Sequence, residues 1–339
     1  MNTQHARQFS RREFLGGVTL TGAVGLLGLH PRPSAAEPPP ETPSLRLVQR
    51  IDALCLSPQY VAEEFLRDEG FTDVQYTKMA GGSGLERALA SGEAHLSMHF
   101  AAALILRVEA GDPVVMLAGG HVGCYELFAT DRVRAIRDLR GKAVAVPARA
   151  SLPGMLLAII LAHVGLDPRK DVDWVESPAA EQVRLLAEGK IDAFLAFPPT
   201  SQELRAKRIG HVLLNTMMDR PWSQYFCCVG AGNREFVRTH PVATKRALRA
   251  ILKSADLCAL EPERAAQALV DKGYAKAYAL QTLTDIPYGK WREYEPEDTI
   301  RFYALRLHEI GMIKSTPQKI IGQGTDWRFL NELKKELKR

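Results

Sequence analysis

The sequence predicts an α/β protein with two lobes, each a mostly parallel sheet flanked by helices. Short apolar segments alternate with amphipathic helical segments from residue 45 to residue 197, which is the pattern of repeated β-α-β units. The later segments of this stretch repeat features of the earlier ones. The 339 residues are 46% hydrophobic and 24% charged, a normal composition for a globular protein of two domains.

The net charge is small and unevenly distributed. Lys and Arg number 44 against 39 Asp and Glu, which gives +5, and residues 1–36 supply +3 of it through four arginines and one glutamate. No basic stripe interleaved with aromatic residues follows, so we expect no nucleic-acid partner. No run of about 20 apolar residues occurs beyond the N-terminus, so we predict no internal transmembrane helix.

The N-terminus has the pattern of an export signal. The pair Arg11-Arg12 precedes an uncharged, glycine-rich run, Phe14–Leu29, and the small residues Ser34–Ala36 offer a cleavage site. These features resemble a bacterial twin-arginine signal, with an ordinary secretory signal as the alternative. We therefore assign residues 1–36 to a signal peptide and residues 37–44 to a proline-rich linker, and we expect the mature chain in the periplasm.

Strands and helices are predicted in a regular order. The first set has strands at Leu45–Ile51, Val74–Lys78, Ala94–Phe100 and Val114–Gly119, and helices at Pro58–Glu69, Leu85–Ala90 and Leu104–Ala110. The second set has strands at Val144–Val146, Val172–Val175 and Ile191–Phe197, and helices at Gly154–His163 and Ala179–Ala187. A buried strand at Tyr225–Val229 precedes a tail whose helices are Pro241–Leu260, Pro262–Lys272 and Glu297–Ile310. We expect this tail to pack around the first lobe.

The two sets share their spacing. Asp73 precedes Gly92 by 19 residues, Asp171 precedes Gly189 by 18, and a strand ends eight residues after each glycine. Similar units indicate two lobes, so we assign residues 45–127 and 232–339 to lobe I and residues 128–231 to lobe II. Ligands of open α/β sheets bind at the carboxyl ends of the strands. Two facing lobes would place both sets of strand ends around one cleft.

Four motifs carry a family resemblance: Ala80–Gly84 before a helix, Ala88–Gly92 after it, Asp138–Val146 and Glu188–Ala193. With them, the stretch from about Leu45 to Lys338 resembles substrate-binding proteins of ABC importers from the nitrate/sulfonate/taurine group, which also resembles thiamine-pyrimidine synthases. The resemblance implies a type II periplasmic binding protein fold. One departure is that His95 stands where the second unit has Asp192, which leaves the local hydrogen bonding of the first unit open.

Two loops before helices are candidates for binding an anion. Gly82, Ser83 and Gly84 precede one helix, and Ser151 with Leu152 begins another. The free backbone N–H groups of a helix start favour an anion, although Ser151 can also serve as a plain N-cap. We therefore expect these residues to hold the acid group of a ligand.

Aromatic and polar side chains would complete the cleft. Phe100 and Phe197 end matched strands, where they can stack on a planar ligand or pack in the core. His121 follows another strand and could donate to a carboxylate or lie exposed. The resemblance implies that the loop after the first strand also lines the cleft, which adds Ser57, Gln59 and Tyr60.

No cysteine or histidine motif predicts a metal site. The five cysteines are Cys55, Cys124, Cys227, Cys228 and Cys258. Cys227 and Cys228 lie in an apolar segment as small buried residues, and a disulfide among the others stays open. His95 and His99 share a strand face, but no carboxylate completes a ligand set. No nucleophile elbow, HExxH, P-loop or dinucleotide fingerprint occurs, so we expect no catalytic residue, metal or cofactor.

The leading hypothesis is an exported, monomeric solute-binding protein. It would capture a small anionic organic solute, such as a sulfonate, carboxylate or aromatic acid, and deliver it to an ABC permease in the inner membrane. The lobes would close about crossings near Phe128–Arg132 and Val229–Asn233. There are two alternatives. One is an exported enzyme on the same scaffold, with a metal or cofactor, and the other is a module that presents solute to a membrane receptor kinase. The sequence does not name the ligand.

Overall fold

The computed structural model describes residues 37–50, 53–79 and 84–338, and Pro39–Arg339 forms one compact unit. The predicted signal peptide and the candidates Gly82 and Ser83 lie outside the described residues. Among the described helices, none combines the length and apolar character needed to cross a membrane.

The first sheet has five strands in the order β2-β1-β3-β10-β4. Its strands are β1 (Ser44–Arg50), β2 (Asp73–Met79), β3 (Leu96–Phe100), β4 (Val114–Val122) and β10 (Phe226–Asn233). β1 pairs parallel with β2 and β3, whereas β10 runs antiparallel between β3 and β4. β3, β4 and β10 are buried along their whole length, which explains their continuous apolar sequences.

The second sheet repeats this arrangement with the order β7-β6-β8-β5-β9. Its strands are β5 (Glu126–Ala129), β6 (Ala143–Val146), β7 (Asp173–Glu176), β8 (Ala193–Ala196) and β9 (His211–Asn215). β6 pairs parallel with β7 and β8, and β5 runs antiparallel between β8 and β9. The predicted two-lobed α/β fold is therefore confirmed, with one antiparallel strand in each sheet.

The antiparallel strand of each sheet arrives from the other lobe. β5 follows directly on β4 of the first sheet, and β10 follows β9 of the second. The crossings therefore lie at residues 123–125 and 216–225, a few residues before the expected positions, because Glu126 already pairs in the second sheet and Phe226 in the first.

The two crossings touch each other. The backbone amides of Cys124 and Tyr125 both donate to Oγ1 of Thr216, at 3.3 and 3.0 Å. Gly123 has φ of +55°, and a Cβ there would lie 2.5 Å from the backbone nitrogen of Met217. Only glycine fits this close approach without strain.

Helices cover the sheets in two groups. Those between strands are η1 (Leu54–Leu56), α2 (Ser57–Tyr60), α3 (Glu63–Asp68), α4 (Gly84–Ser91), α5 (Ala101–Glu109), η2 (Ile136–Leu139), α6 (Leu152–His163), α7 (Ala179–Ala187), α8 (Thr200–Lys207) and η3 (Trp222–Gln224). The tail holds α9 (Arg234–Thr239), α10 (Pro241–Leu260), α11 (Pro262–Val270), α12 (Lys276–Asp285), η4 (Tyr288–Arg292), α13 (Pro296–Glu309), α14 (Pro317–Gly324) and α15 (Arg328–Glu336).

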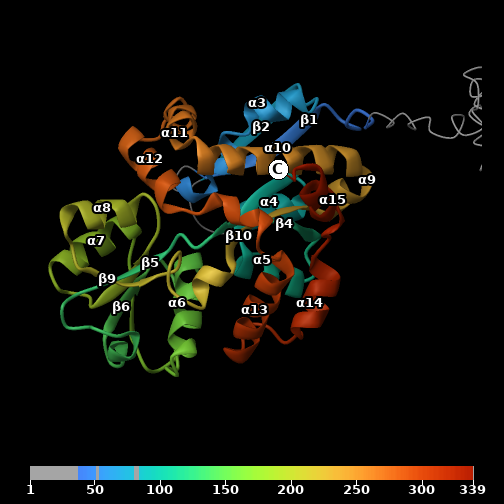
Figure 1. Cartoon of the computed structure of the whole chain (residues 1–339). Helices are drawn as coiled ribbons and strands as arrows, with labels where there is room; N and C mark the ends of the chain where they lie inside the picture. The colour runs from blue at the N-terminus through green and yellow to red at the C-terminus, as the bar shows by residue number, and fades with distance from the viewer. Residues whose placement is uncertain (1–36, 51–52, 80–83, 339) are drawn as a thin grey trace, which may run out of the picture. The chain divides into compact units, whose positions relative to one another are not determined.

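The tail packs mainly on the first lobe, as expected, but it also reaches the second. α10 contacts α2 and α3, α13 and α14 contact α5, and α15 contacts β4. α12 also contacts α8 of the second lobe, and α13 contacts α6. In Figure 1 the second lobe is coloured green to yellow and the tail orange to red. Arg205 of α8 forms ion pairs with Asp285 of α12 and with Glu126.

His95 takes the structural role that Asp192 has in the second lobe. The backbone amide of Arg46 donates to His95 Nδ1 at 3.2 Å, while the amide of His95 donates to the carbonyl of Arg46 at 2.8 Å. In the second lobe the amide of Ala143 donates to Asp192 Oδ2 at 3.0 Å, and the amide of Asp192 donates back at 2.7 Å. The imidazole therefore replaces the carboxylate as acceptor, and the hydrogen bonding left open by the sequence is the same in both units.

Candidate functional site

A small cavity of about 20 Å³ lies between the two sheets, where strand ends of both lobes meet the crossing. Its lining residues come from three places: the first lobe, the crossing segment and the second lobe. They are Arg50, Ala53, Cys55, Leu56, His99, Phe100, Cys228, Cys124, Tyr125, Leu152 and Phe197. This is the cleft position that two facing α/β lobes predict.

Three of the predicted ligand-binding residues line this cavity: Phe100, Leu152 and Phe197. Phe100 ends β3 and Phe197 follows β8, so the matched strand ends do meet. Tyr125 lies between them, with its ring centroid 6.1 Å from Phe100 and 5.4 Å from Phe197. The three rings form an aromatic wall that suits the body of a planar or apolar solute.

The side chains of Ser57 and Gln59 hydrogen-bond to the scaffold instead of lining the cavity. Ser57 is buried and donates its hydroxyl to the carbonyl of Leu54. Gln59 is also buried, donating to the carbonyl of Val48 at 2.7 Å and accepting from the amide of Met98 at 2.6 Å. These bonds tie the loop to β1 and β3, so the two side chains act through the loop they hold.

Tyr60 positions the end of β1. Its hydroxyl accepts from the backbone amide of Arg50 at 3.1 Å and lies 3.2 Å from the carbonyl of the same residue. Tyr274 donates to that carbonyl at 3.0 Å and stacks on Tyr60 with ring centroids 5.9 Å apart. Burial is the main reason that the pKa of Tyr60 is raised well above its usual value, so the hydroxyl stays protonated.

The two predicted helix starts have different outcomes. Ser151 caps α6, since its Oγ accepts from the amide of Gly154 at 3.3 Å and donates to the carbonyl of Ala148. This confirms the N-cap and places the next residue, Leu152, against the cavity. Gly84 is the first residue of α4 and directly follows residues outside the described range, so its contact with a ligand stays a prediction.

The structure adds Arg50, which the sequence analysis did not select. It ends β1, is only 7% exposed and lines the cavity beside His99. His99 Nε2 in turn lies 2.9 Å from Glu86 Oε1, and both side chains are buried. Burial raises the pKa of Glu86, but His99 and Arg50 outweigh this and lower it, so the carboxylate is charged. The available signal in the sequence was a charged residue close to the end of the predicted strand Leu45–Ile51.

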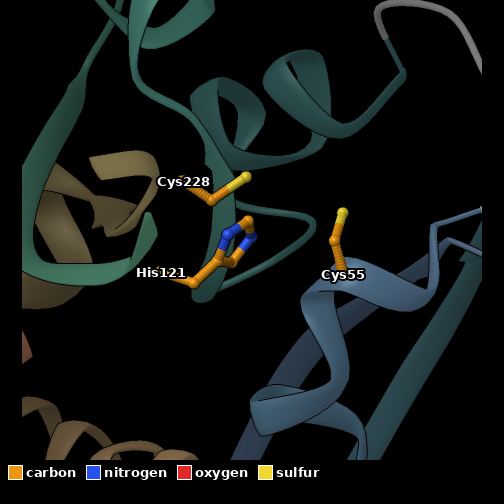
Figure 2. A group of neighbouring side chains, drawn as sticks. All are labelled: Cys55, His121 and Cys228. Carbon is orange, nitrogen blue, oxygen red and sulfur yellow. The ribbon is translucent and has the colours of Figure 1, made fainter. Parts of the chain in front are cut away.

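His121 lies in a group of thiols instead of an exposed position. It is fully buried on β4, and Cys228 is its direct cross-strand neighbour on β10. The Sγ atoms of Cys55 and Cys228 and a ring nitrogen of His121 all lie within 4.8 Å of one another. Figure 2 shows the three side chains. Cys124 and Cys227 adjoin this group, with their sulfurs 3.5 Å apart. All five cysteines are free and buried.

The members of this group influence one another's protonation. Burial alone would lower the pKa of His121, but the neighbouring sulfurs, Cys228 first and then Cys55, raise it above its usual range. Burial alone would raise the pKa of Cys228, yet contacts with Cys124 and Cys55 lower it. The imidazole and the thiol therefore each favour the charged form of the other, and such neighbours are typical of a reactive or metal-binding cysteine.

A larger hollow of about 400 Å³ lies elsewhere, between the end of α6 and the end of α13. It is open, and Gly165–Arg169 and His308–Gly311 form most of its lining. In the part of the chain that the structure describes, no strand of either sheet ends there. The smaller cavity between the lobes is the better candidate because strand ends, buried aromatic rings and a buried arginine converge on it.

Comparison with known proteins agrees with this geometry. A model of the NMT1-like family matches residues 39–270. The periplasmic nitrate-binding protein NrtA from Synechocystis has a TM-score of 0.73 at 16% identity, over 89% of this chain and 90% of that one. The periplasmic sulfonate-binding protein SsuA from Methylobacillus flagellatus has a TM-score of 0.68 at 19% identity, over 87% and 94%.

One curated relative matches part of the chain. The nitrate import ATP-binding protein NrtC from Synechocystis is 25% identical over 186 residues, which are 52% of this chain and 27% of that protein. The chain thus spans about a quarter of the length of this relative.

The two-lobed fold is the one that these periplasmic binding proteins share. The chain belongs to the NMT1-like family, and the resemblance to the nitrate/sulfonate group of ABC-importer binding proteins is confirmed.

Proposed function

We propose that this protein is an exported solute-binding protein of an ABC importer. It captures a small anionic organic solute between its lobes and delivers it to a permease in the inner membrane. The fold shared with nitrate- and sulfonate-binding proteins supports the binding role and a periplasmic location. The predicted twin-arginine signal supports export, and we propose a monomer without enzymatic activity. Presentation of the solute to a membrane receptor would use the same cleft.

The observation that carries the anionic class is the position of Arg50. Its guanidinium belongs to a side chain that is 7% exposed and lines the cavity together with His99 and the aromatic wall. A guanidinium binds carboxylate and sulfonate oxygens through charge-assisted hydrogen bonds, which are strongest away from water. The first turn of α6, which begins at the cavity, adds a second favourable position for negative charge.

The aromatic wall selects the body of the solute. Phe100, Tyr125 and Phe197 offer ring faces and edges close to the arginine. A nitrate ion would leave this apolar surface without a partner, whereas an organic acid with an aromatic or alkyl body would cover it. We therefore favour aromatic and alkyl carboxylates or sulfonates over inorganic anions.

Thermal unfolding against a panel of solutes tests this proposal. A ligand present at about 100 times its dissociation constant stabilises the folded state by roughly 2.7 kcal/mol, which gives a clear rise in Tm. We expect organic sulfonates or carboxylates to raise Tm and nitrate and neutral pyrimidines to leave it unchanged. A rise with neutral solutes alone would contradict the anionic class.

Arg50→Met links the response to the site. Loss of a charge-assisted hydrogen bond in the cleft should weaken binding about 10- to 100-fold, because such bonds contribute about 1.5–3 kcal/mol. Arg67→Met is the matched control, since Arg67 is exposed and forms an ion pair with Glu63 one turn earlier on the same helix. Equal affinity of both variants would refute the role of Arg50.

A further inference from the structure

The thiol group around His121 has the composition of a metal site. Its members come from three separated segments: Cys55 from η1, His121 from β4 and Cys228 from β10. All three are buried, and their ligand atoms lie within 4.8 Å of one another. Figure 2 shows the imidazole and the two thiol groups around one shared space. Two sulfurs and one imidazole nitrogen are a ligand set that zinc prefers.

The strand geometry explains why these side chains meet. Cys228 pairs with His121 across β10 and β4, and the register of this pair shifts on both sides of Cys228. Such a bulge re-aims side chains and is common beside functional sites. Cys55 approaches from the loop after β1, which Tyr288 holds by donating its hydroxyl to the carbonyl of Cys55 at 3.1 Å.

The orientation of His121 is fixed by its other ring nitrogen. Nδ1 lies 2.7 Å from the carbonyl oxygen of Gly123, and because a carbonyl only accepts, Nδ1 must carry the proton and donate it. Nε2 is therefore the nitrogen left for the thiols, and this fully buried atom has no hydrogen-bond partner among the described residues. A metal-binding histidine is typically held by such an N–H to a backbone carbonyl.

Charge favours a divalent ion over a monovalent one. Two thiolates and one neutral imidazole around Zn²⁺ give a net charge of zero, which suits a buried position. Cu⁺ in the same position would leave one negative charge without compensation. Zn–S bonds of about 2.3 Å place two sulfurs about 3.8 Å apart in a tetrahedral site, so ligand atoms within 4.8 Å of one another need to approach by at most about 1 Å.

We propose that Cys55, His121 and Cys228 bind one Zn²⁺ at the floor of the interlobe cleft. Three protein ligands leave a fourth position open. The adjoining cavity of about 20 Å³, which Cys55 and Cys228 line, has room for one water molecule or one donor atom of a solute. The site goes beyond the proposed solute-binding function and does not depend on it.

Cobalt substitution and metal analysis of the full chain under reducing conditions test the site. We expect one Zn²⁺ per chain after dialysis, and a thiolate-to-cobalt charge-transfer band when Co²⁺ replaces it. Cys55→Ser and Cys228→Ser should each lower metal affinity at least tenfold. Cys258→Ser is the matched control, because Cys258 is an equally buried free cysteine on α10 outside the group, and its affinity should be unchanged.

X-ray absorption at the zinc edge examines the unmutated chain, so the test does not depend on how the variants fold. Two sulfur and one or two nitrogen or oxygen neighbours support the assignment. Three or four sulfurs would overturn it, because Cys124 and Cys227 would then be ligands. A Cys55–Cys228 disulfide or the absence of the cobalt band would also overturn it. Solute binding is measured separately on the zinc-loaded and the metal-free chain, so failure of either proposal can be recognised.

Discussion

Acid should destabilise this protein through His95, whose imidazole must stay neutral to accept the amide proton of Arg46. The ring is 8% exposed and stacks on Phe236 with centroids 4.1 Å apart. Burial is the first cause that lowers the pKa of His95, and the positive charges of Arg46 and His240 follow, which brings it from 6.5 to about 4. Protonation would place a second donor opposite the donating amide.

The sign and size of the effect follow from linkage. A histidine with a lowered folded pKa takes up its proton more readily in the unfolded chain, so stability is complete above pH 6.5 and falls as the pH drops towards 4. The fall of the His95 pKa from 6.5 to about 4 corresponds to roughly 3 kcal/mol of unfolding free energy at the acid end of this window. Most of that loss should lie between pH 6 and 4.

His95→Asn isolates this contribution. The amide oxygen of Asn lies near the position of Nδ1 and can accept from Arg46, but it does not titrate. Urea unfolding at several pH values between 7.5 and 4 gives the free energies of the wild type and the variant. We expect their difference to shift by about 3 kcal/mol in favour of the variant as the pH falls.

The exposed His308 supplies the control, since His308→Asn should leave the wild-type pH profile unchanged. A difference between wild type and His95→Asn that stays constant with pH would refute the reasoning. It would mean that His95 either titrates normally in the folded protein or does not accept from the amide.

Two further predictions concern stability. The carboxylate of Glu69 is buried, 2.6 Å from the guanidinium of Arg249 and 3.2 Å from Nζ of Lys253. Glu69→Gln removes the charge from these ion pairs and should lower the free energy of unfolding in urea by about 3 kcal/mol. Glu263→Gln is the control, because Glu263 is exposed and its replacement should change this free energy little. At Gly154 in the first turn of α6, a Cβ would lie 2.5 Å from two backbone oxygens, so Gly154→Ala should cost about 1–3 kcal/mol and weaken solute binding. Thermal unfolding measures this cost. Gly322→Ala is the control, because Gly322 lies on α14 with open space where a Cβ would be, and this variant should not be destabilised.

The sequence predicted the parts of the fold that local pattern determines. The repeated β-α-β units appear where expected, and α7 (Ala179–Ala187) and α10 (Pro241–Leu260) have the predicted bounds. The expected helix at Pro58–Glu69 is instead two helices, α2 and α3, interrupted at residues 61–62. β5, β9 and α8 were not predicted, because they are short and their sequences lack a clear period.

The ligand-facing residues were only partly predictable for a related reason. Phe100 and Phe197 were found because each ends a strand of a repeated unit, and that position is set by spacing along the chain. Ser57 and Gln59 were selected by resemblance, which identifies a loop but not the direction of its side chains. Arg50 ends β1, but arginine is usually exposed, so a charged residue at a strand end does not by itself predict a buried position in the cleft.

The group of thiols around His121 could not be predicted from the spacing of residues along the chain, because the antiparallel strands bring distant residues together. Cys124 and Cys227 are 103 residues apart in the chain, and their sulfurs are 3.5 Å apart only because the chain crosses between the lobes twice. β10 returns from the second lobe between β3 and β4, and this places Cys228 opposite His121. An apolar strand sequence is required there for burial on both faces, and Cys227 and Cys228 both satisfy it as small buried residues, so the sequence pattern shows only the packing and not the proposed metal-binding role of Cys228.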